Sequence, residues 1–462
     1  MKDNKVARLM RAAALFRQQF AQEIGGICSW VLGEAEIAAI VNTYVKKSRV
    51  RIYSPLDTLR LFVGQVLCER ACQDAVGRRL SERVAHGQSQ NTLNTGAYCQ
   101  ARARLPIEVP LQLGAKIGQR LEVAAPRAWR WRNRVVKLFD GTTVSMPDTL
   151  SNQQAFPQSE EQQPGLGFPI ARIGALIGLA GGGVLGHQVT ACKGKGSGEQ
   201  SLLRALLPLI QPRDVVLADA LLASWWMIAD VLARGGDVVM PQHGRRITDF
   251  TRGQRFGKHD HLVAWARPPR PRSMPIERYD RYPQWLRMRE VKVHGRILVS
   301  SLREPKVVSA HALAALYALR WSIEVDFRTI KATLKMDVLR CKTEAMIEKE
   351  IAVHLLAYNL VRWSMATSAR LADVLPRALS FSGAQCLLNA FSDQLRHSVE
   401  ESLSCLVRTV LTNIAKLKLP LRPGRIEPRA KKRRPKPLPL LTVPRNVARE
   451  LIRTRRDLIQ VP

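Results

Sequence analysis

The sequence lacks the features of several protein classes. Its longest run without formal charge, residues 173–192, is rich in glycine and contains His187 and Gln188, so it makes a poor membrane span. Residues 1–20 lack the uncharged core of a signal peptide and are typical of a basic amphipathic helix. The eight cysteines form no CxxC pair and no zinc-finger spacing. We therefore expect a cytoplasmic protein with reduced thiols and no zinc site.

Acidic residues are scarce relative to basic ones. Lys and Arg number 72 against 38 Asp and Glu, which gives a formal net charge of +34. An excess of this size fits a polyanionic partner, and nucleic acid is the usual one. Binding of a ribosomal type or binding to a membrane surface is the alternative. The 462 residues predict two to four structural units with ample core.

A helix with a polar stripe is predicted at residues 310–335. No Gly or Pro interrupts this segment, and its apolar residues recur at three- and four-residue steps: Leu313, Leu316, Ile323, Phe327, Ile330 and Leu334. At ~100° per residue, a second stripe within roughly 60° of arc lies beside this face. Its members are Tyr317, Arg320, Glu324 and Lys331. The spacing predicts one carboxylate that projects between two cations and a phenol.

This stripe suits a site that processes phosphates. A carboxylate can hold a divalent metal ion while Arg and Lys hold phosphate oxygens nearby. A solvated helix face with ordinary ion pairs is the alternative. Asp326 falls on the opposite side of the helix, so we do not expect it to be the functional acid.

The spacing Tyr317-x2-Arg320-x3-Glu324-x6-Lys331 resembles the Y-R-E-K signature of the DDE transposases of insertion sequence family four. These are cut-and-paste transposases of bacterial mobile elements. The resemblance implies an RNase H-like α/β fold, cleavage of DNA at the ends of the element, and strand transfer to a target.

Two further acids follow predicted strands. Residues 135–139 form a short extended run that ends in Asp140-Gly141-Thr142, where the glycine lets the chain turn. A second strand of the buried type ends in Asp219. Ligands of open sheets gather at the carboxyl ends of strands. The Asp-Gly-Thr sequence also resembles the motif that carries the first catalytic aspartate of the family.

Three other aspartates are weaker candidates. Asp148 lies in a loop with no strand to fix it, and Asp214 starts its strand and points away from the carboxyl end. Asp230 lies inside a predicted helix. We therefore expect the earlier pair of acids, and none of these three, to converge with Glu324.

The order of predicted elements between residues 135 and 241 is strand, two further strands, helix, strand, helix and strand, which is the order of an RNase H-like core. A separate insertion must follow, because 105 residues (324 − 219) separate Asp219 from Glu324. The predicted domains are a helical DNA-end-binding domain (1–105), the first part of the catalytic core (130–241), a β-rich insertion (242–309), the core helix and its successor (310–368), and a helical C-terminal region with a basic tail (369–462).

The first domain carries clustered arginines on short helices. Ser54-Pro55-Leu56-Asp57 predicts a helix start, with Ser as the N-cap. Later helices carry the candidate DNA-binding residues Arg78, Arg79 and Arg102. These helices suit a module of the helix-turn-helix kind. A helical packing domain with a solvated basic surface is the alternative.

The insertion contains a second set of candidates. Arg245, Arg246 and Arg252 lie in a stretch that resembles the family's DNA-contacting loop. Trp265 or Trp285 could stack on an unpaired or flipped base, or either could be a core residue.

Three other segments of the sequence are interpreted separately. The sequence His259-Asp260-His261 is too crowded to form a metal cluster and is expected at a loop surface. The glycine-rich loop 194–198 lacks the frame of a P-loop. The proline-containing basic segment 422–436 is expected to be an arm for phosphate contacts.

The three acids and the resemblance together imply a mechanism. Asp140, Asp219 and Glu324 would hold two Mg²⁺ or Mn²⁺ ions roughly 4 Å apart. Tyr317, Arg320 and Lys331 would bind DNA phosphates beside Glu324. The expected partners are double-stranded DNA, as terminal inverted repeats and target, and a second copy of the chain in a homodimeric, nucleoid-associated synaptic complex. A non-catalytic sequence-specific DNA-binding protein and an RNase H-like nuclease without strand transfer are the alternatives.

Overall fold

A computed structural model describes residues 32, 34–45, 52–85, 87, 93–194, 196–397, 400–420 and 440–454. The basic helix predicted at 1–20 and the basic arm at 422–436 lie outside the described residues. Within the described part of the chain, no helix is long and apolar enough to cross a membrane.

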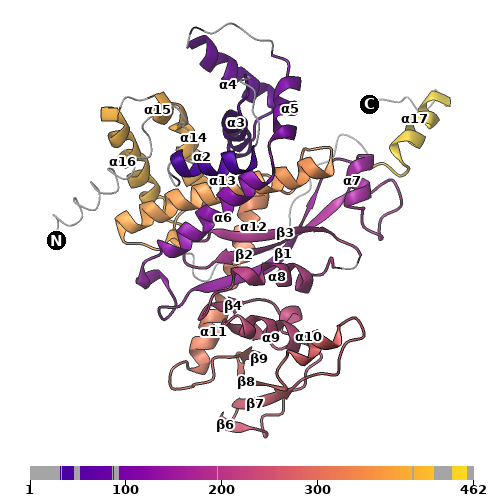
Figure 1. Ribbon diagram of the computed structural model, residues 1–462, viewed down its shortest axis with the longest axis vertical. Coiled ribbons are helices and arrows are strands. Elements are labelled where there is room, and N and C mark those ends of the chain that lie inside the picture. The colour runs from indigo at the N-terminus through magenta and orange to yellow at the C-terminus, as the bar shows by residue number, and fades with distance from the viewer. Residues whose placement is uncertain are drawn as a thin grey trace.

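A nine-stranded mixed sheet runs through the centre of the molecule (Figure 1). Its spatial order is β3-β2-β1-β4-β5-β9-β8-β7-β6, in which β1, β4 and β5 are parallel and all other neighbours are antiparallel. The strands are β1 (Val136–Ser145), β2 (Ile170–Gly178), β3 (Val184–Ala191), β4 (Val215–Leu217), β5 (Asp237–Pro241), β6 (Gln254–Gly257), β7 (Asp260–Ala266), β8 (Trp285–Val293) and β9 (Arg296–Ser300).

Helices cover this sheet and build a separate lobe above it (Figure 1). They are α2 (Glu34–Tyr44), α3 (Pro55–Cys68), α4 (Cys72–Ala85), α5 (Gly96–Arg104), α6 (Glu108–Val123), α7 (Leu150–Ala155), α8 (Glu199–Leu206), α9 (Trp225–Ala233), α10 (Ile276–Asp280), α11 (Ala310–Ala318), α12 (Trp321–Arg328), α13 (Glu344–Ala372), α14 (Phe381–Ala390), α15 (Ser392–His397), α16 (Glu400–Lys416) and α17 (Arg445–Thr454). The order β1-β2-β3-α8-β4-α9-β5 is the one predicted, so the mixed α/β class with an RNase H-like core is confirmed.

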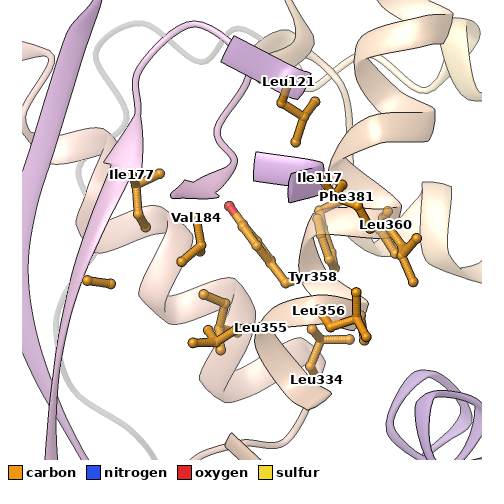
Figure 2. Packing of buried hydrophobic residues seen from close by; sticks show 14 of the residues in the cluster. Ile117, Leu121, Ile177, Val184, Leu334, Leu355, Leu356, Tyr358, Leu360 and Phe381 are labelled. Carbon is orange, nitrogen blue, oxygen red and sulfur yellow. The ribbon is translucent and has the colours of Figure 1, made fainter. Parts of the chain in front are cut away.

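The long helix α13 is the packing centre between the sheet and the helical lobe. Its Tyr358 lies among side chains of α6, β3 and α14 (Figure 2), and it stacks on Phe381 with ring centroids 5.2 Å apart. The next residue, Asn359, accepts a bond from Val184 N at 2.8 Å and donates to Gly114 O and Val184 O. One buried amide therefore satisfies backbone groups of both α6 and β3.

The N-terminal helices are joined by charge pairs. Ser54 caps α3 as predicted, because its hydroxyl accepts the Asp57 amide at 3.1 Å. Arg60 of α3 pairs with Glu82 of α4 at 2.6 Å, and Arg79 of α4 pairs with Asp57 of α3 at 2.9 Å. These arginines stabilise the contact between two helices.

The segment 242–309, predicted to be β-rich, contains the strands β6, β7, β8 and β9. This segment is continuous with the core sheet. β9 pairs with β5, with Val239 opposite Ser300, so β6 to β9 extend the core sheet. Sequence distance placed this segment outside the core, whereas hydrogen bonding makes it continuous with the core.

Candidate active site

The first candidate acid, Asp140, lies inside β1. The strand does not end there as predicted but continues to Ser145, because Gly141 and the residues after it pair with β2. Gly141 does not adopt the left-handed conformation that a turn glycine needs. Its amide instead donates a hydrogen bond to Asp140 Oδ1 at 2.8 Å. The glycine therefore has a role other than turning the chain.

Asp219 lies beside Asp140 because of the strand register. β1 and β4 are parallel and pair Leu138 with Leu217, and each aspartate follows two residues later. Burial raises the pKa of Asp140 above its ordinary value, and the negative charge of Asp219 raises it further. The structure thus brings these two predicted acids together.

The segment predicted as one helix is divided in the structure. α11 ends at Ala318 and α12 begins at Trp321, and between them Arg320 N donates to Tyr317 O in a tighter three-residue step. The chain then passes from α12 into a π-helical turn, Thr329–Thr333. The predicted continuous helix was therefore wrong at two places, neither of which contains Gly or Pro.

Arg320 connects α12 to the central strand. Its guanidinium donates to Asp140 Oδ2 at 3.0 Å and also pairs with Glu324 one helical turn further on. A cation between two carboxylates offsets their mutual repulsion. The third predicted acid is consequently held next to the first.

The other two members of the polar stripe also border this site. Tyr317 is only 8% exposed and hydrogen-bonds Arg320, and burial raises the pKa of its phenol. Lys331 lies in the π-helical turn and donates to Thr143 O at 2.8 Å and Thr142 Oγ1 at 3.4 Å. Lys331 therefore lies against β1, and Tyr317 lies next to the break between α11 and α12.

Glu199 is an acid of this region that the sequence analysis did not single out. It opens α8, and a Cβ added to Gly141 would lie only 2.7 Å from Glu199 Oε1. Burial raises the pKa of Glu199, and the charges of Asp219 and Asp140 raise it further. The signal available in the sequence was one acid in the first turn after a glycine-rich loop, which does not reveal its spatial neighbours.

Asp326 is directed into the core, away from the other acids. It is fully buried, accepts hydrogen bonds from Arg362 at 2.6 Å and Tyr358 at 2.9 Å, and pairs with Arg377 at 2.9 Å. Paired charges of this kind hold α12 against α13 and the segment that follows it. Its position agrees with the expectation that Asp326 is not the functional acid.

The donor chemistry of the site fits a hard divalent cation. Asp140, Asp219 and Glu324 offer carboxylate oxygens, which Mg²⁺ and Mn²⁺ prefer, and the Arg320 guanidinium already places a positive charge between two of them. Among the described residues, no three His, Cys, Asp or Glu side chains are gathered closely enough to hold one metal ion. The positive charge of Arg320 offsets part of the negative charge of Asp140 and Glu324.

A family model matches the part of the chain that carries this site. Residues 131–360, about half of the chain, match the family model of the transposase DDE domain, and this range includes Asp140, Asp219 and Glu324. The protein is a DDE transposase. Members of this family cleave DNA and transfer strands, and they typically use divalent metal ions.

Two comparisons concern individual transposases. The chain is 27% identical over 366 residues to the transposase InsG for insertion sequence element IS4 of Escherichia coli strain K12, covering 73% of this chain and 76% of InsG. This similarity supports a transposase of the IS4 type. A piggyBac transposase in a synaptic complex with hairpin DNA gives a TM-score of 0.41 at 12% identity, covering 91% of this chain and 87% of the other. That likeness adds nothing to the assignment.

The basic candidates of the N-terminal helices differ in their surroundings. Arg79 is engaged with Asp57 and with the backbone of Ile52, and Arg102 lies over the Phe62 ring at 4.5 Å. These two arginines of the transposase contribute to internal packing. Arg78 is partly exposed and makes no ion pair with a described residue.

Trp265 is a core residue in the structure. It is 2% exposed, donates from Nε1 to the buried Glu290 at 2.7 Å, and is covered by the Arg246 guanidinium at 3.6 Å. The hypothesis that Trp265 stacks on a base is therefore incorrect for this arrangement. Trp285 is 58% exposed and is the tryptophan of the pair that a base could reach.

The remaining candidates of this region divide between surface and interior. Arg245 and Arg252 are exposed. The prediction of a surface loop is wrong for His261, which is 1% exposed, lies in β7, and bonds to Arg252 O at 2.7 Å and to Glu290 at 3.1 Å. It anchors the loop that carries the exposed arginines.

Proposed function

We propose that Asp140, Asp219 and Glu324 are the catalytic acids with which this transposase cuts DNA at the ends of an insertion sequence. The observation that carries the proposal is the Arg320 guanidinium, which bonds both Asp140 and Glu324 beside Asp219. The strand register sets Asp219 beside Asp140, and all three acids belong to the matched DDE domain, which supports the proposal.

The ion that fits these ligands is Mg²⁺, with Mn²⁺ as a substitute. When bound, two such ions activate water or a 3′-hydroxyl and stabilise the leaving oxygen. The role of the protein is to hold the carboxylates on rigid elements and to keep Arg320 within reach of them.

Tyr317, Arg320 and Lys331 are proposed to bind the phosphates next to the cleaved bond. Their donors lie along β1 and α12 beside the acids, and charge-assisted bonds to phosphate oxygens are strong. Because Arg320 is shared between the acids and the phosphates in this scheme, DNA and metal binding are coupled through it.

The proposed DNA partners are the terminal inverted repeats and a target duplex. A net charge of +34 favours binding to both. Pairing of two ends in one synaptic complex requires two active sites, which makes a homodimer the proposed active form. Arg78, Arg245, Arg252 and Trp285 are exposed or partly exposed and are the proposed contacts outside the acidic centre.

The test uses a duplex that carries the terminal repeats flanking the gene of this transposase. Strand scission is followed with and without Mg²⁺ for the unchanged protein, for Glu324→Gln, and for Glu344→Gln, which removes an exposed acid at the start of α13. We expect metal-dependent nicking at the repeat boundary that Glu324→Gln abolishes and Glu344→Gln retains, with end binding preserved in both.

The alternatives give different products. A non-catalytic DNA-binding protein would bind the repeats without scission in Mg²⁺ or Mn²⁺. A nuclease without strand transfer would nick the repeats but leave no product joined to a target duplex. Full scission by Glu324→Gln would contradict the assignment of the third acid.

A further inference from the structure

Four loops of the chain meet at the edge of the sheet where the parallel strands β1, β4 and β5 begin. These strands open at Val136, Val215 and Asp237, which lie in one register. β9 pairs antiparallel with β5, so the residues after β9 lie at the same edge. The loops before β1, β4 and β5 and the loop after β9 are therefore neighbours in space.

Hydrogen bonds join these four loops directly. Arg134 Nε donates to Arg213 O at 2.8 Å, and Arg213 N donates to Gly235 O at 2.8 Å. Asp237 pairs with Arg134 and also accepts a hydrogen bond from Ser301 Oγ. The backbone of each loop is thus fixed relative to the next one.

Each of the four loops carries an exposed arginine, and these are Arg132, Arg213, Arg234 and Arg303. Within the described part of the chain, none of them forms an ion pair. The Arg132 guanidinium lies 5.7 Å from the ring centre of Trp131, and the exposed Glu304 adjoins Arg303 without pairing with it. Unpaired positive charges gathered at one edge repel one another and favour an anionic partner.

Two of these arginines adopt a backbone conformation that favours glycine. Arg132 has a φ of 48° and Arg213 a φ of 70°, and Asn133 beside Arg132 has a φ of 60°. This left-handed region is sterically unfavourable for a long side chain, whereas glycine enters it without that penalty. Stability alone would therefore favour glycine at both positions. An arginine held in such a conformation indicates a role for its charge.

We propose that this edge is a second DNA-binding surface of the transposase, here named the arginine edge, with the members Arg132, Arg213, Arg234 and Arg303. Arg213 precedes Asp219 by six residues, and Arg134 precedes Asp140 by the same number. At ~3.3 Å per residue, roughly 20 Å separates the edge from the acids. The DNA phosphates that the arginine edge contacts therefore lie away from the bond that is cut.

The arrangement fits the backbone of duplex DNA. β1, β4, β5 and β9 are successive neighbours in the sheet, and four strands at a spacing of roughly 4.8 Å span about 15 Å. Each DNA strand offers a phosphate about every 3.4 Å along the axis. A row of arginines of this length can meet several phosphates, and each guanidinium can donate two parallel hydrogen bonds to phosphate oxygens. Because phosphate contacts carry no sequence information, the arginine edge binds duplexes of any sequence.

The experiment measures DNA binding by the full-length protein without metal. Its partner, duplex DNA, is taken from the proposed function, and the inference rests on that function in this respect. Fluorescence anisotropy gives Kd for a duplex of arbitrary sequence and for the repeat duplex between about 50 and 200 mM salt. The test variant combines Arg132→Gly with Arg213→Gly. The control combines Arg408→Gln with Lys416→Gln, which removes two exposed positive charges from α16.

We expect the salt dependence of binding to become less steep in the test variant. The slope of log Kd against log salt should fall by about 1.8, which is about 0.9 for each of two lost phosphate contacts, with both duplexes. The control should keep the slope of the unchanged protein. The test variant should melt at the same or a higher temperature, because glycine suits both backbone positions. Weaker DNA binding without a loss of stability is a result that a purely structural role would not give.

Three results would overturn the inference. The first is a slope in the test variant that equals that of the control. The second is a loss of binding to the repeat duplex alone, which would show recognition of sequence. The third is weaker binding to phosphatidylserine vesicles with an unchanged DNA slope, which would make a membrane surface the partner.

Scission separates this inference from the proposed function. If the unchanged protein cuts the repeat duplex in Mg²⁺ and the slopes of test variant and control are equal, the arginine edge is overturned and the proposed function stands. If the unchanged protein does not cut but the test variant has the smaller slope, the proposed function is wrong and the arginine edge stands.

Discussion

Arg320 donates a hydrogen bond to Asp140 Oδ2 at 3.0 Å across a sequence separation of 180 residues. The same guanidinium pairs with Glu324. One cation therefore positions two of the three proposed acids and offsets part of their negative charge. In the proposed function, this dual contact makes Arg320 the residue through which metal binding, DNA binding and stability are linked.

Replacement of Arg320 tests this linkage. Arg320→Ala should lower the thermal stability of the metal-free transposase, because Asp140 and Glu324 lose their shared counter-charge. The same variant should gain more thermal stability from added Mg²⁺ than the unchanged protein, because no arginine competes for the carboxylates. Melting temperatures with and without Mg²⁺ measure both effects. An identical gain in the two proteins would show that Arg320 does not restrict access to the acids.

Asp326 should behave as a structural acid. Asp326→Asn leaves Arg362 and Arg377 with weakened compensation in the core, so the free energy of unfolding should fall by about 3–5 kcal/mol. Asp148→Asn is the control, since Asp148 is exposed and bonds only Gln153 among the described residues. Denaturant titration compares the two variants. Equal stabilities would contradict a role for Asp326 in holding α12 to α13.

Replacement of the two tryptophans of the β7–β8 region should affect stability to very different extents. Trp265→Ala should cost about 3–5 kcal/mol, because it removes a buried ring, whereas Trp285→Ala should change stability by less than about 0.5 kcal/mol. If a base stacks on Trp285, a 2-aminopurine placed at the repeat boundary should be quenched on binding, and Trp285→Ala should restore its fluorescence. Unchanged quenching in Trp285→Ala would exclude this contact.

Glu199 should make stability depend on pH in a definite direction. Burial and the neighbouring acids raise its pKa, so the folded state binds the proton more tightly than the unfolded chain does. The free energy of unfolding should therefore fall as pH rises from the unfolded-state pKa through the higher folded-state pKa.

The variant Glu199→Gln removes that loss and should be the more stable protein at neutral pH without metal. Solvent screening of this partly exposed group limits the gain to about 0.5 kcal/mol, or about 1–2 °C in melting temperature. Scans across pH measure the difference, which should shrink toward acidic pH. Coincident curves at every pH would show that Glu199 carries no electrostatic cost.

Much of the secondary structure follows from local pattern. Ser54 and Pro55 begin α3 where the cap rule places the start, and β5 is the last strand of the order predicted for residues 135–241. The predictions of helix and strand boundaries were wrong where the local sequence gives no signal. The break near Arg320 contains no Gly or Pro, and β1 continues past Asp140 because β2 supplies hydrogen bonds that a strand's own sequence does not reveal.

The sequence by itself determined the basic character, the order of strands and helices, and the spacing of Tyr317, Arg320, Glu324 and Lys331. These depend on composition and on contacts within a few residues. Only the tertiary structure decided that Glu199 lies against Gly141, that Arg320 bonds across to β1, and that Trp265 is buried while Trp285 is exposed. Such relationships depend on strand register and helix packing between distant segments, which periodicity along one segment does not specify.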